Sequence, residues 1–541
     1  GFLLLSTHEV GLQERERERG VFLDCLLMSN PTTPCLRPED QEEFVSHLVL
    51  EALEENHGVV EEGLGIDIEE ALQTPSFLAG LSLVEDAVNS VLPQEAATAA
   101  IAAAVAVLSR KKWFVTDEEQ AEESIHEIFK DLKVSQVRHA VDREFLEKRI
   151  ETDGIDESFY VVDLGTVIKK LADWKRELPN VHPFYAIKCN PDEGILRVLN
   201  SLGVNFDCAS REEIALVLSL GVEPSRIIYA NPCKMRSHLR FSKAAGVHLM
   251  TVDSESEIRK TASEDPKAEL VLRLATDDSH SLCAFSSKFG TSGLAEQRRL
   301  LSIIKEVGLN MVGVSFHVGS GCQDAASYTK ALRDCRAVFD VAEELGFEPY
   351  LVDIGGGFPG NDFSAAVTFP QMAAAIREGL LEYFPDPEGN RYSFIAEPGR
   401  YFATGSHTLA CNIFTKKVKV EEDPAQRHNT YYIDDGIYQS FNCIYFDHVH
   451  ITPRPLKKLA PDHPKIPTTI FGPTCDSIDK IAEGILVEDL EVDDWLYFED
   501  MGAYTRASAS AFNGFGSRKI VYVCSFAGFH MVEPLSPMVT D

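Results

Sequence analysis

The chain has 541 residues, of which 44% are hydrophobic, 9% aromatic and 25% charged. This is the composition of an ordinary globular protein. It excludes a wholly disordered or collagen-like chain, and the length leaves room for about two to four domains. The formal net charge of −34 disfavours both the neutralisation of nucleic-acid phosphates and adsorption to anionic membranes. We therefore expect neither nucleic acid nor membrane as a partner.

The first part of the chain differs in charge from the rest. Residues 1–110 hold 20 acidic and 5 basic side chains, a net charge of −15, whereas the other 431 residues carry −19. Apolar residues recur at helical spacing in 42–56 and 77–92. We predict that residues 1–113 form an acidic extension, helical or partly disordered, that is either an ornament or a docking surface. Gly1 stands where an initiator Met is usual, so the sequence leaves the true N-terminus open.

The sequence predicts neither a membrane span nor a metal site. The longest run of small apolar residues, 96–108, has 13 residues, fewer than the roughly 20 that cross a bilayer. The 12 cysteines include no C-x-x-C pair and form no His/Cys cluster with zinc spacing. Scattered cysteines without a visible export signal indicate a reducing compartment, so we expect a cytoplasmic protein.

The middle of the chain has the pattern of a barrel. Residues 114–180 are expected to hold lead-in helices, the first beginning at a capping box over 116–119. Between 181 and 400, eight short β-rich runs alternate with helical patterns, some of which start at capping boxes (210–213 and 254–257). The runs end near Lys188, Ala209, Tyr229, Val252, Ala275, His317, Ile354 and Glu397. Eight such units predict a (β/α)8 barrel over 181–400, although the count alone also fits an open doubly wound sheet.

Beyond Arg400 the helical periodicity fades. Short β-type runs occur at 418–420, 430–433, 496–498 and 519–524, with turn residues between them. We predict a second, mainly β domain over 401–541. The fold class is therefore α/β, a TIM-type barrel followed by a β domain.

Ionisable residues stand at the ends of several predicted barrel strands, where barrel enzymes place their working residues. Lys188 closes an apolar run and is a candidate for Schiff-base chemistry, although a solvent-facing strand cap is the commoner role for a single lysine. Each of the other ionisable residues at these strand ends, taken singly, also has an ordinary structural role. Their convergence on one rim favours catalysis. The other residues of this set are Asp207, Arg273, His317 and Glu397.

The seventh run ends in a loop with three consecutive glycines, 355–357. Such a loop lets backbone N–H groups approach an anion, and the loops after strands 7 and 8 are the usual phosphate site of a barrel. Arg400 can add a charge-assisted contact. A tight turn is the alternative. Together with a strand-end Lys and Glu, this loop would suit a phosphorylated aldehyde cofactor, with Gly357 and Arg400 at the phosphate and a carboxylate at the ring nitrogen.

Longer motifs resemble a known family. They are FYAIKCN (184–190), FDCAS (206–210), VSFHVGSGC (314–322), DIGGGFPG (353–360), AEPGRYF (396–402), FNCIYFDHVH (441–450), FGPTCDSID (471–479) and MGAYTRASASAFNGF (501–515). These motifs resemble eukaryotic ornithine decarboxylase, a pyridoxal-phosphate enzyme with an alanine-racemase-like barrel. The likeness runs from about residue 144 to the C-terminus. It implies pyridoxal 5'-phosphate as cofactor, ornithine as substrate, putrescine and carbon dioxide as products, and a homodimer with shared active sites.

The resemblance also implies roles for single residues. Lys188 would form the Schiff base beside Asp207, His317 would stack on the cofactor ring, and Glu397, supported by Arg273, would pair with the ring nitrogen. The phosphate would be held by Ser320, Gly357, Arg400 and Tyr504. Cys475 would supply a proton to the substrate's α-carbon. Substrate would be bound by Asp447, Asp476 and Phe512, with Cys475 and Asp476 contributed by the other subunit. Phe159–Asp163 would belong to the β domain.

Three alternatives stay open at this stage. Phe446 and Ser477 depart from the family's common Tyr and Gly beside the substrate residues, so lysine, arginine or diaminopimelate compete with ornithine as substrate. A catalytically inactive relative similar to antizyme inhibitor is the second, which the complete set of cofactor residues disfavours. The third concerns 231–262, which resembles the antizyme-contacting region of animal relatives and makes an antizyme-like regulator a candidate partner. Lys234, Arg236, Arg240 and Lys243 of this segment fit a solvated basic face equally well.

Overall fold

The structure is a computed structural model, and it describes residues 118–525 apart from 138–140, 364, 387–390 and 420–426. The chain divides into two units, 1–111 and 112–541, and only the second contains described residues. The predictions for residues 1–113 therefore lie outside the described part. No helix among the described residues is long and apolar enough to cross a membrane.

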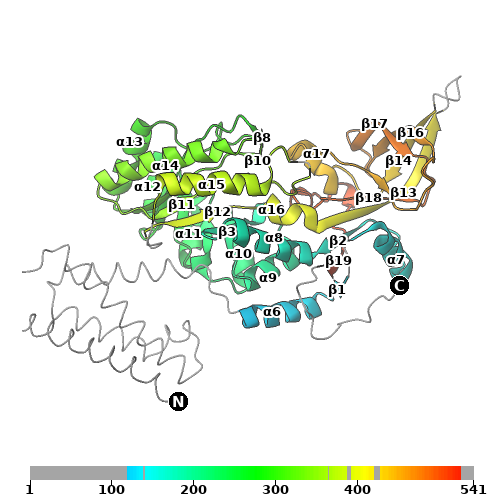
Figure 1. The fold of residues 1–541 in the computed structure, drawn as a ribbon, viewed down its shortest axis with the longest axis horizontal. Helices are drawn as coiled ribbons and strands as arrows, with labels where there is room; N and C mark the ends of the chain where they lie inside the picture. The colour runs from blue at the N-terminus through cyan, green and yellow to red at the C-terminus, as the bar shows by residue number, and fades with distance from the viewer. Residues whose placement is uncertain (1–117, 138–140, 364, 387–390, 420–426, 526–541) are drawn as a thin grey trace, which may run out of the picture. The chain divides into compact units, whose positions relative to one another are not determined.

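Eight parallel strands close into a barrel, in the order β11-β12-β3-β4-β5-β6-β7-β9. Figure 1 labels β3, β11 and β12 of this barrel. Each ends within two residues of the predicted position, which confirms the barrel and rules out the open sheet. The strands are β3 (Val181–Ala186), β4 (Asn205–Cys208), β5 (Ile227–Tyr229), β6 (Leu249–Val252), β7 (Glu269–Arg273), β9 (Asn310–Ser315), β11 (Leu351–Asp353) and β12 (Ser393–Ala396).

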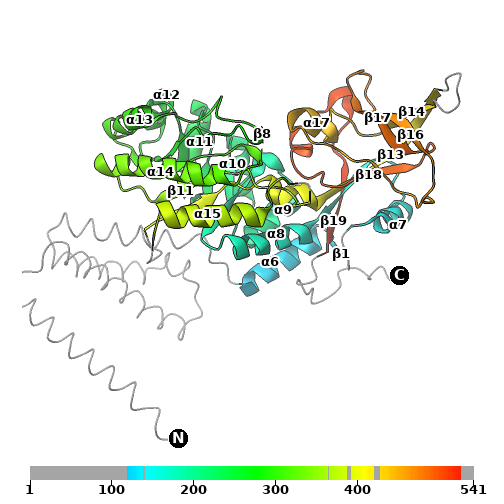
Figure 2. The ribbon, with the colours of Figure 1, turned by 45° about the horizontal axis from the view of Figure 1, so that its top comes forward.

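Helices surround the barrel (Figure 2). Helix α8 (Leu164–Glu177) precedes the first strand. The helices that follow successive strands are α9 (Glu193–Ser201), α10 (Arg211–Ser219), α11 (Arg236–Ala244), α12 (Glu255–Glu264), α13 (Leu294–Glu306), α14 (Ala326–Glu344), α15 (Phe369–Tyr383) and α16 (Arg400–Ala403). Two additional short strands, β8 (Ser281–Cys283) and β10 (Ser320–Cys322), form a pair in the loops after β7 and β9.

The predicted helix caps form only in part. At α10, the Ser210 side chain accepts the backbone N–H of Glu213, as a capping box requires. The Glu213 carboxylate, however, accepts the N–H of Ala209 instead of that of Ser210. At α12 the helix starts after Ser254 as expected, but the Ser254 side chain makes no capping hydrogen bond. The sequence pattern thus located the helix starts correctly and was wrong about the capping contact at Ser254.

The barrel interior is filled by apolar side chains from seven of its strands, which leaves the charged residues for the strand ends. This buried cluster contains Phe184, Ile228, Ala230, Leu249, Val271, Val312, Leu351 and Ile395. Alternation along a strand sends every second side chain to the same face. The strand β4 differs, because at Asn205 and Asp207 it contributes buried polar residues.

The second domain is a nine-stranded sheet, whose main path runs β1-β19-β2-β13-β14-β16-β17. Its strands are β1 (Ser135–Gln136), β2 (Phe159–Asp163), β13 (His407–Lys419), β14 (His428–Ile433), β15 (Arg454–Pro455), β16 (Lys465–Phe471), β17 (Lys480–Glu488), β18 (Trp495–Phe498) and β19 (Lys519–Cys524). Strand β2 lies between β13 and β19, as the resemblance implies. Helix α6 (Glu118–Asp131) leads in as predicted, and α7 (Arg143–Asp153) and α17 (Cys443–Phe446) complete the elements.

The long strand β13 ties the sheet together. Its first half pairs with β2 and β18, and its second half pairs with β14. The predicted run at 418–420 captured only the end of this strand. Most of the first seven residues are buried, so the sequence shows no alternation there. The domains also touch directly, because the Asn190 side chain donates to the Gly502 carbonyl at 2.7 Å.

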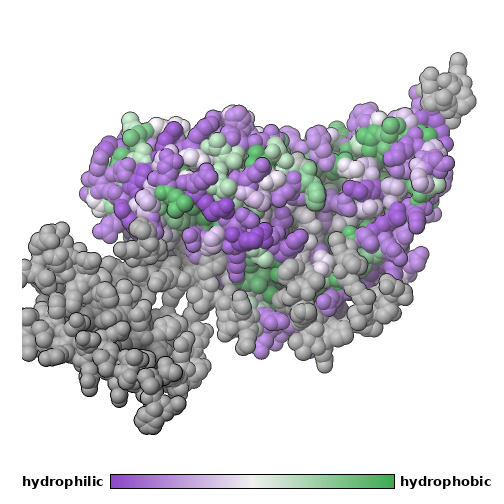
Figure 3. Space-filling model, viewed as in Figure 1, coloured by the Kyte–Doolittle hydropathy of each residue, from purple (hydrophilic) through white to green (hydrophobic). Residues whose placement is uncertain are grey.

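The described surface is largely hydrophilic on the face shown in Figure 3, and hydrophobic residues form small separate groups on it. This distribution agrees with the acidic composition of the chain. Among the large apolar side chains that are exposed, Tyr445, Phe446, Ile478 and Phe512 are close in sequence to predicted substrate residues.

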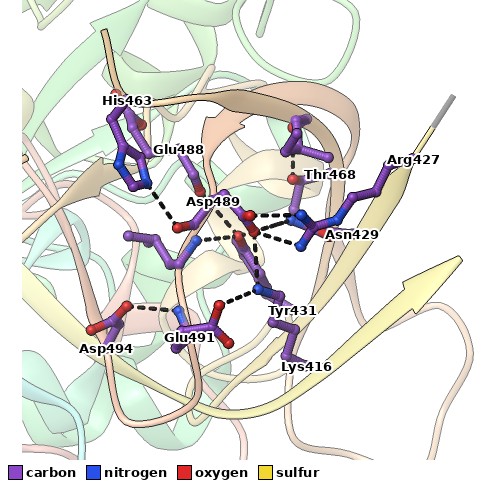
Figure 4. Close-up of polar contacts among 12 residues, drawn as sticks. Lys416, Arg427, Asn429, Tyr431, His463, Thr468, Glu488, Asp489, Glu491 and Asp494 are labelled. Carbon is purple, nitrogen blue, oxygen red and sulfur yellow. Dashed lines mark hydrogen bonds and ion pairs between the residues drawn. The ribbon is translucent and has the colours of Figure 1, made fainter. Parts of the chain in front are cut away.

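A network of hydrogen bonds around one carboxylate connects β13, β14 and the end of β17 (Figure 4). Asp489, just after β17, accepts hydrogen bonds from Lys416 of β13 at 2.9 Å, Arg427 at 2.9 Å and Asn429 of β14 at 3.0 Å. Burial raises the pKa of Asp489, but the donors from Lys416 and Asn429 outweigh it, so the pKa lies below its usual value. The ionised carboxylate is therefore favoured in the folded state.

We expect Asp489→Asn to lower the free energy of unfolding by about 2 kcal/mol at neutral pH, because charge-assisted hydrogen bonds are lost. A carboxyl with a depressed folded pKa stabilises above its unfolded pKa of about 3.9, and that contribution disappears as the pH falls through the folded pKa. Unfolding curves should therefore separate at pH 7 and converge below about pH 4. The exposed Asp462→Asn is the control and should change stability by less than about 0.5 kcal/mol. A constant difference at all pH values would contradict the electrostatic account.

Candidate active site

Lys188 opens the site at the carboxyl end of the first barrel strand. It lies in a short 3-10 turn directly after β3, and its ammonium forms an ion pair with Asp207 at the end of β4. The Lys188 side chain is 41% exposed, whereas that of Asp207 is fully buried. Desolvation lowers the pKa of Lys188, but the charges of Asp207 and Glu397 outweigh it and raise the pKa overall. The lysine is thus reachable, charged and held by a neighbouring carboxylate.

Two further carboxyl groups lie together at the ends of β11 and β12. The backbone N–H of Glu397 donates to the Gly355 carbonyl at 2.7 Å, and the N–H of Gly355 donates to Asp353 Oδ1 at 2.9 Å. Burial, and then the charges of Asp353 and Asp207, raise the pKa of Glu397 well above its usual value. Burial likewise raises the pKa of Asp353 to about 7. A cationic group placed against Glu397 would therefore stabilise its ionised carboxylate and pair with it.

His317 follows β9 and is neutral. Burial is the main cause that lowers its pKa well below the usual value, and the positive charges of Arg273 and Lys188 add to it. Its Nδ1 accepts the N–H of Gly319 at 3.0 Å, so the remaining ring proton lies on Nε2. Arg273 ends β7 with its guanidinium 5.2 Å from the centre of the Phe289 ring. A neutral imidazole in this position can pack against a flat ring without adding charge.

Arg400 begins α16 and joins residues from three parts of the chain. Its Nε and Nη2 donate to Ser320 Oγ at 3.2 and 2.8 Å, and its Nη1 and Nη2 donate to the two carboxylate oxygens of Asp447 at 2.9 and 2.5 Å. The guanidinium also lies 5.1 Å from the ring centre of Tyr504. Tyr504 in turn donates its backbone N–H to the Cys189 carbonyl, next to Lys188. Through Tyr504, the arginine is therefore linked to the segment that carries Lys188.

The glycine run 355–357 leaves no room for side chains. A Cβ at Gly356 would lie 2.8 Å from His317 Nε2, and a Cβ at Gly357 would lie 2.9 Å from the Gly319 carbonyl oxygen. Gly357 also has φ +108°, which other residues rarely adopt. The loop thus packs its bare backbone against His317 and the Ser320 segment.

The remaining predicted residues form a second cluster. The Tyr438 hydroxyl donates to Asp476 at 2.5 Å, and Phe512 stacks on the Tyr438 ring with centroids 4.4 Å apart. Asn513 accepts the backbone N–H of Cys475. The hydrogen bond from Tyr438 is the main cause that lowers the pKa of Asp476. Within the described residues, no hydrogen bond or ion pair joins this cluster to Lys188 or Arg400.

The structure thus brings ten of the predicted residues to the mouth of the barrel and leaves three in a separate cluster. The ten are Lys188, Asp207, Arg273, His317, Ser320, Gly357, Glu397, Arg400, Asp447 and Tyr504. Sequence reasoning missed Asp353, Tyr438 and Asn513. Asp353 could have been recognised as a charged residue at the end of an apolar strand. Tyr438 and Asn513 carry no local signal, because each acts on a partner about 38 residues away.

These residues fit a pyridoxal phosphate. An accessible lysine can bind the aldehyde, a carboxyl of high proton affinity can face the ring nitrogen, and a neutral imidazole can cover the ring. Backbone N–H groups of a glycine loop, a serine hydroxyl and a guanidinium can hold the phosphate. Among the described residues, no group of His, Cys, Asp and Glu could hold a metal ion.

Fold and site together define a pyridoxal-phosphate-dependent decarboxylase, since residues 164–404 match the family described as "Pyridoxal-dependent decarboxylase, pyridoxal binding domain". The chain is 46% identical over 403 residues to ornithine decarboxylase of Mus pahari, covering 72% of this chain and 87% of the relative. It is also 46% identical over 385 residues to antizyme inhibitor 2 of Xenopus laevis, covering 70% and 84%. The chain belongs to the eukaryotic ornithine decarboxylase family.

A solved structure supports the same architecture. The arginine decarboxylase of Paramecium bursaria Chlorella virus superposes with a TM-score of 0.66 at 32% identity, covering 70% of this chain and all of that one.

We expect Gly357→Ala to weaken the binding of pyridoxal phosphate at least about tenfold, because the new Cβ forces the loop away from Ser320 and Arg400. The matched control is Gly221→Ala. Gly221 also has a positive φ, +79°, but a Cβ there meets nothing within 4 Å. Titration of each apoprotein with the cofactor, followed by absorbance, measures the effect. Equal affinities for the two variants would show that the loop does not bind the phosphate.

Proposed function

We propose that the protein decarboxylates L-ornithine to putrescine and carbon dioxide with pyridoxal 5'-phosphate, a step of polyamine biosynthesis. The observation that carries this proposal is the position of Lys188. It is reachable at the barrel mouth and lies beside Asp207, with Glu397 at the end of the neighbouring strand β12 and His317 after β9 on the same rim. This constellation serves the binding and activation of an aldehyde cofactor, and it has no evident structural purpose.

When bound, the cofactor supplies an aldehyde that condenses with amines and a ring that accepts the electron pair released by decarboxylation. Lys188 must lose a proton to act as a nucleophile, and until it does Asp207 holds the charged amine in place at the barrel mouth. Glu397 keeps the ring nitrogen protonated, since its raised pKa makes it a strong partner for a cation. His317, neutral and half-buried, would cover the ring and exclude water from that face.

The phosphate would be held by Ser320, Gly357, Arg400 and Tyr504, and the distal ammonium of the substrate by Asp447 and Asp476. An ammonium removed from water must be paired, so these carboxylates select a cationic side chain over an apolar one. The exposed thiol of Cys475 would return a proton to the α-carbon after carbon dioxide leaves. Phe512 lines the same pocket. Phe446 and Ser477 keep lysine, arginine and diaminopimelate as rival substrates.

An inactive regulator is the second candidate, because a protein named antizyme inhibitor 2 has the same identity to this chain, 46%, as the ornithine decarboxylase of Mus pahari. Identity alone therefore does not separate the two functions. The retained contacts of Lys188 and Arg400 favour an enzyme, since a regulator needs neither a paired lysine nor a phosphate-type arginine at the barrel mouth.

We further propose a homodimer with shared active sites. Cys475, Asp476 and Phe512 form a cluster of their own in this chain, and a second subunit would bring that cluster to the barrel mouth. Exposed apolar side chains lie next to both groups in the sequence: Ile478, 56% exposed, follows Asp476, and Phe446, 69% exposed, precedes Asp447. Apolar groups of this kind often mark protein interfaces.

An antizyme-like regulator remains a proposed partner, with the segment 231–262 as its candidate contact. Part of the basic face expected there is absent among its described residues, because Lys234 is fully buried and bonded to the Thr251 carbonyl. Arg236 and Arg240 point to Glu264 at the surface. We also propose a cytoplasmic location, since the ten cysteines of the described part are free thiols.

The purified protein should release carbon dioxide fastest from L-ornithine when ornithine, lysine, arginine and diaminopimelate compete in one assay. Lys188→Ala should lose the absorbance of the lysine-bound cofactor and nearly all activity, because no other amine replaces it. The exposed Lys243→Ala is the control and should retain both. An unchanged cofactor spectrum in Lys188→Ala would refute the assignment of the lysine, and preference for another substrate would refute ornithine.

The shared site predicts complementation. Lys188→Ala and Cys475→Ala should each be nearly inactive, and their mixture should regain up to about a quarter of the wild-type activity, because half of the dimers are mixed and each has one intact site. Subunit exchange is verified with differently tagged chains. If exchange occurs and activity does not return, each chain builds its site alone.

A further inference from the structure

The cation expected to hold the cofactor's phosphate already has an anion of this chain bound to it. Arg400 makes four hydrogen bonds, two to Ser320 and two to Asp447. The two bonds to Asp447 use Nη1 and Nη2 together and meet the two carboxylate oxygens separately, at 2.9 and 2.5 Å. This is the bidentate arrangement in which a guanidinium also binds a phosphate.

We propose that Asp447 is an internal counter-ion of the phosphate subsite. The cofactor's phosphate and the Asp447 carboxylate compete for Arg400, and the carboxylate released by the phosphate binds the substrate's distal ammonium. This inference rests on the proposed function for the identity of the two ligands. It assigns Asp447 a positioning role that neither the motif nor the fold reveals.

The contacts of Arg400 leave little room for both anions. A guanidinium has five N–H groups, and the four bonds to Ser320 and Asp447 engage both terminal nitrogens and Nε. The Tyr504 ring lies 5.1 Å from the guanidinium carbon. The side chains of Arg400 and Asp447 are only 16% and 4% exposed. A phosphate that takes the terminal nitrogens must therefore displace Asp447.

The burial of Asp447 determines how the binding of phosphate changes the affinity for an ammonium group. A carboxylate that is 4% exposed and loses its cation is strongly destabilised unless another cation replaces it. Phosphate binding should therefore raise the affinity of the site for an ammonium group. By thermodynamic linkage, an ammonium ligand must raise the affinity for phosphate by the same factor.

The coupling can be measured on the full-length apoprotein without turnover. Calorimetry gives the affinity for inorganic phosphate with and without saturating putrescine, and the affinity for putrescine with and without saturating phosphate. We expect each ligand to raise the affinity of the protein for the other about five- to tenfold, by equal factors. Independent binding, or binding in which each ligand weakens the other, would overturn the proposal. This part requires no variant, so it does not depend on the folding of a mutant.

Asp447→Asn tests the competition itself. The variant should bind inorganic phosphate about tenfold more tightly than the wild type, because the internal anion is gone. Putrescine should then no longer change the affinity for phosphate. Asp476→Asn is the control. Asp476 contacts Tyr438 and not Arg400. Its loss should therefore weaken the binding of putrescine and leave the affinity for phosphate, measured without putrescine, unchanged. Unchanged or weaker phosphate binding by Asp447→Asn would refute the inference.

The outcome is separable from that of the proposed function. Phosphate binding to Arg400 requires neither the lysine-bound cofactor nor decarboxylation. Tighter phosphate binding by Asp447→Asn in a protein that does not decarboxylate ornithine would refute only the function. Normal decarboxylation with unchanged phosphate affinity would refute only the counter-ion role.

Discussion

Charged groups that leave water must find opposite charges, and this requirement governs the mouth of the barrel. Lys188 holds Asp207, and Arg400 holds Asp447, each cation paired with a carboxylate that is at most 4% exposed. Among the described residues, neither Asp353 nor Glu397 forms an ion pair, and burial raises the pKa of both carboxyl groups. The mouth of the barrel therefore combines two ion pairs with two buried carboxyl groups whose pKa values are raised.

Much of the fold was predictable because parallel barrel strands are short apolar runs that repeat with helices between them. The eight strands and the sheet membership of Phe159–Asp163 follow from patterns in single segments or from motif resemblance. The strands β16 and β17 could not be predicted in this way. Their pairing is interrupted by irregular register near Thr468 and Ile470, and their burial does not alternate regularly.

The site was predictable only as far as chain topology goes. Strand ends of a barrel converge, so Lys188, His317 and Glu397 could be placed on one rim from sequence order alone. The anion that Arg400 binds in the structure could not be predicted in the same way. The motifs assign Arg400 and Asp447 to different ligands, phosphate and substrate, and no periodicity links Arg400 at the start of α16 with Asp447 directly after α17. That contact depends on how two domains pack, which local patterns do not encode.

The position of β2 in the sheet constrains how the protein folds during its synthesis. β2 is synthesised before the barrel, but its neighbours β13 and β19 come after it. On the ribosome, a strand whose five residues are all buried in the final fold must remain unpaired while the entire barrel emerges. The β domain can therefore close only as a late step. Helix α8, which follows β2 directly and packs on the barrel side, is the element placed to keep that strand near its future site.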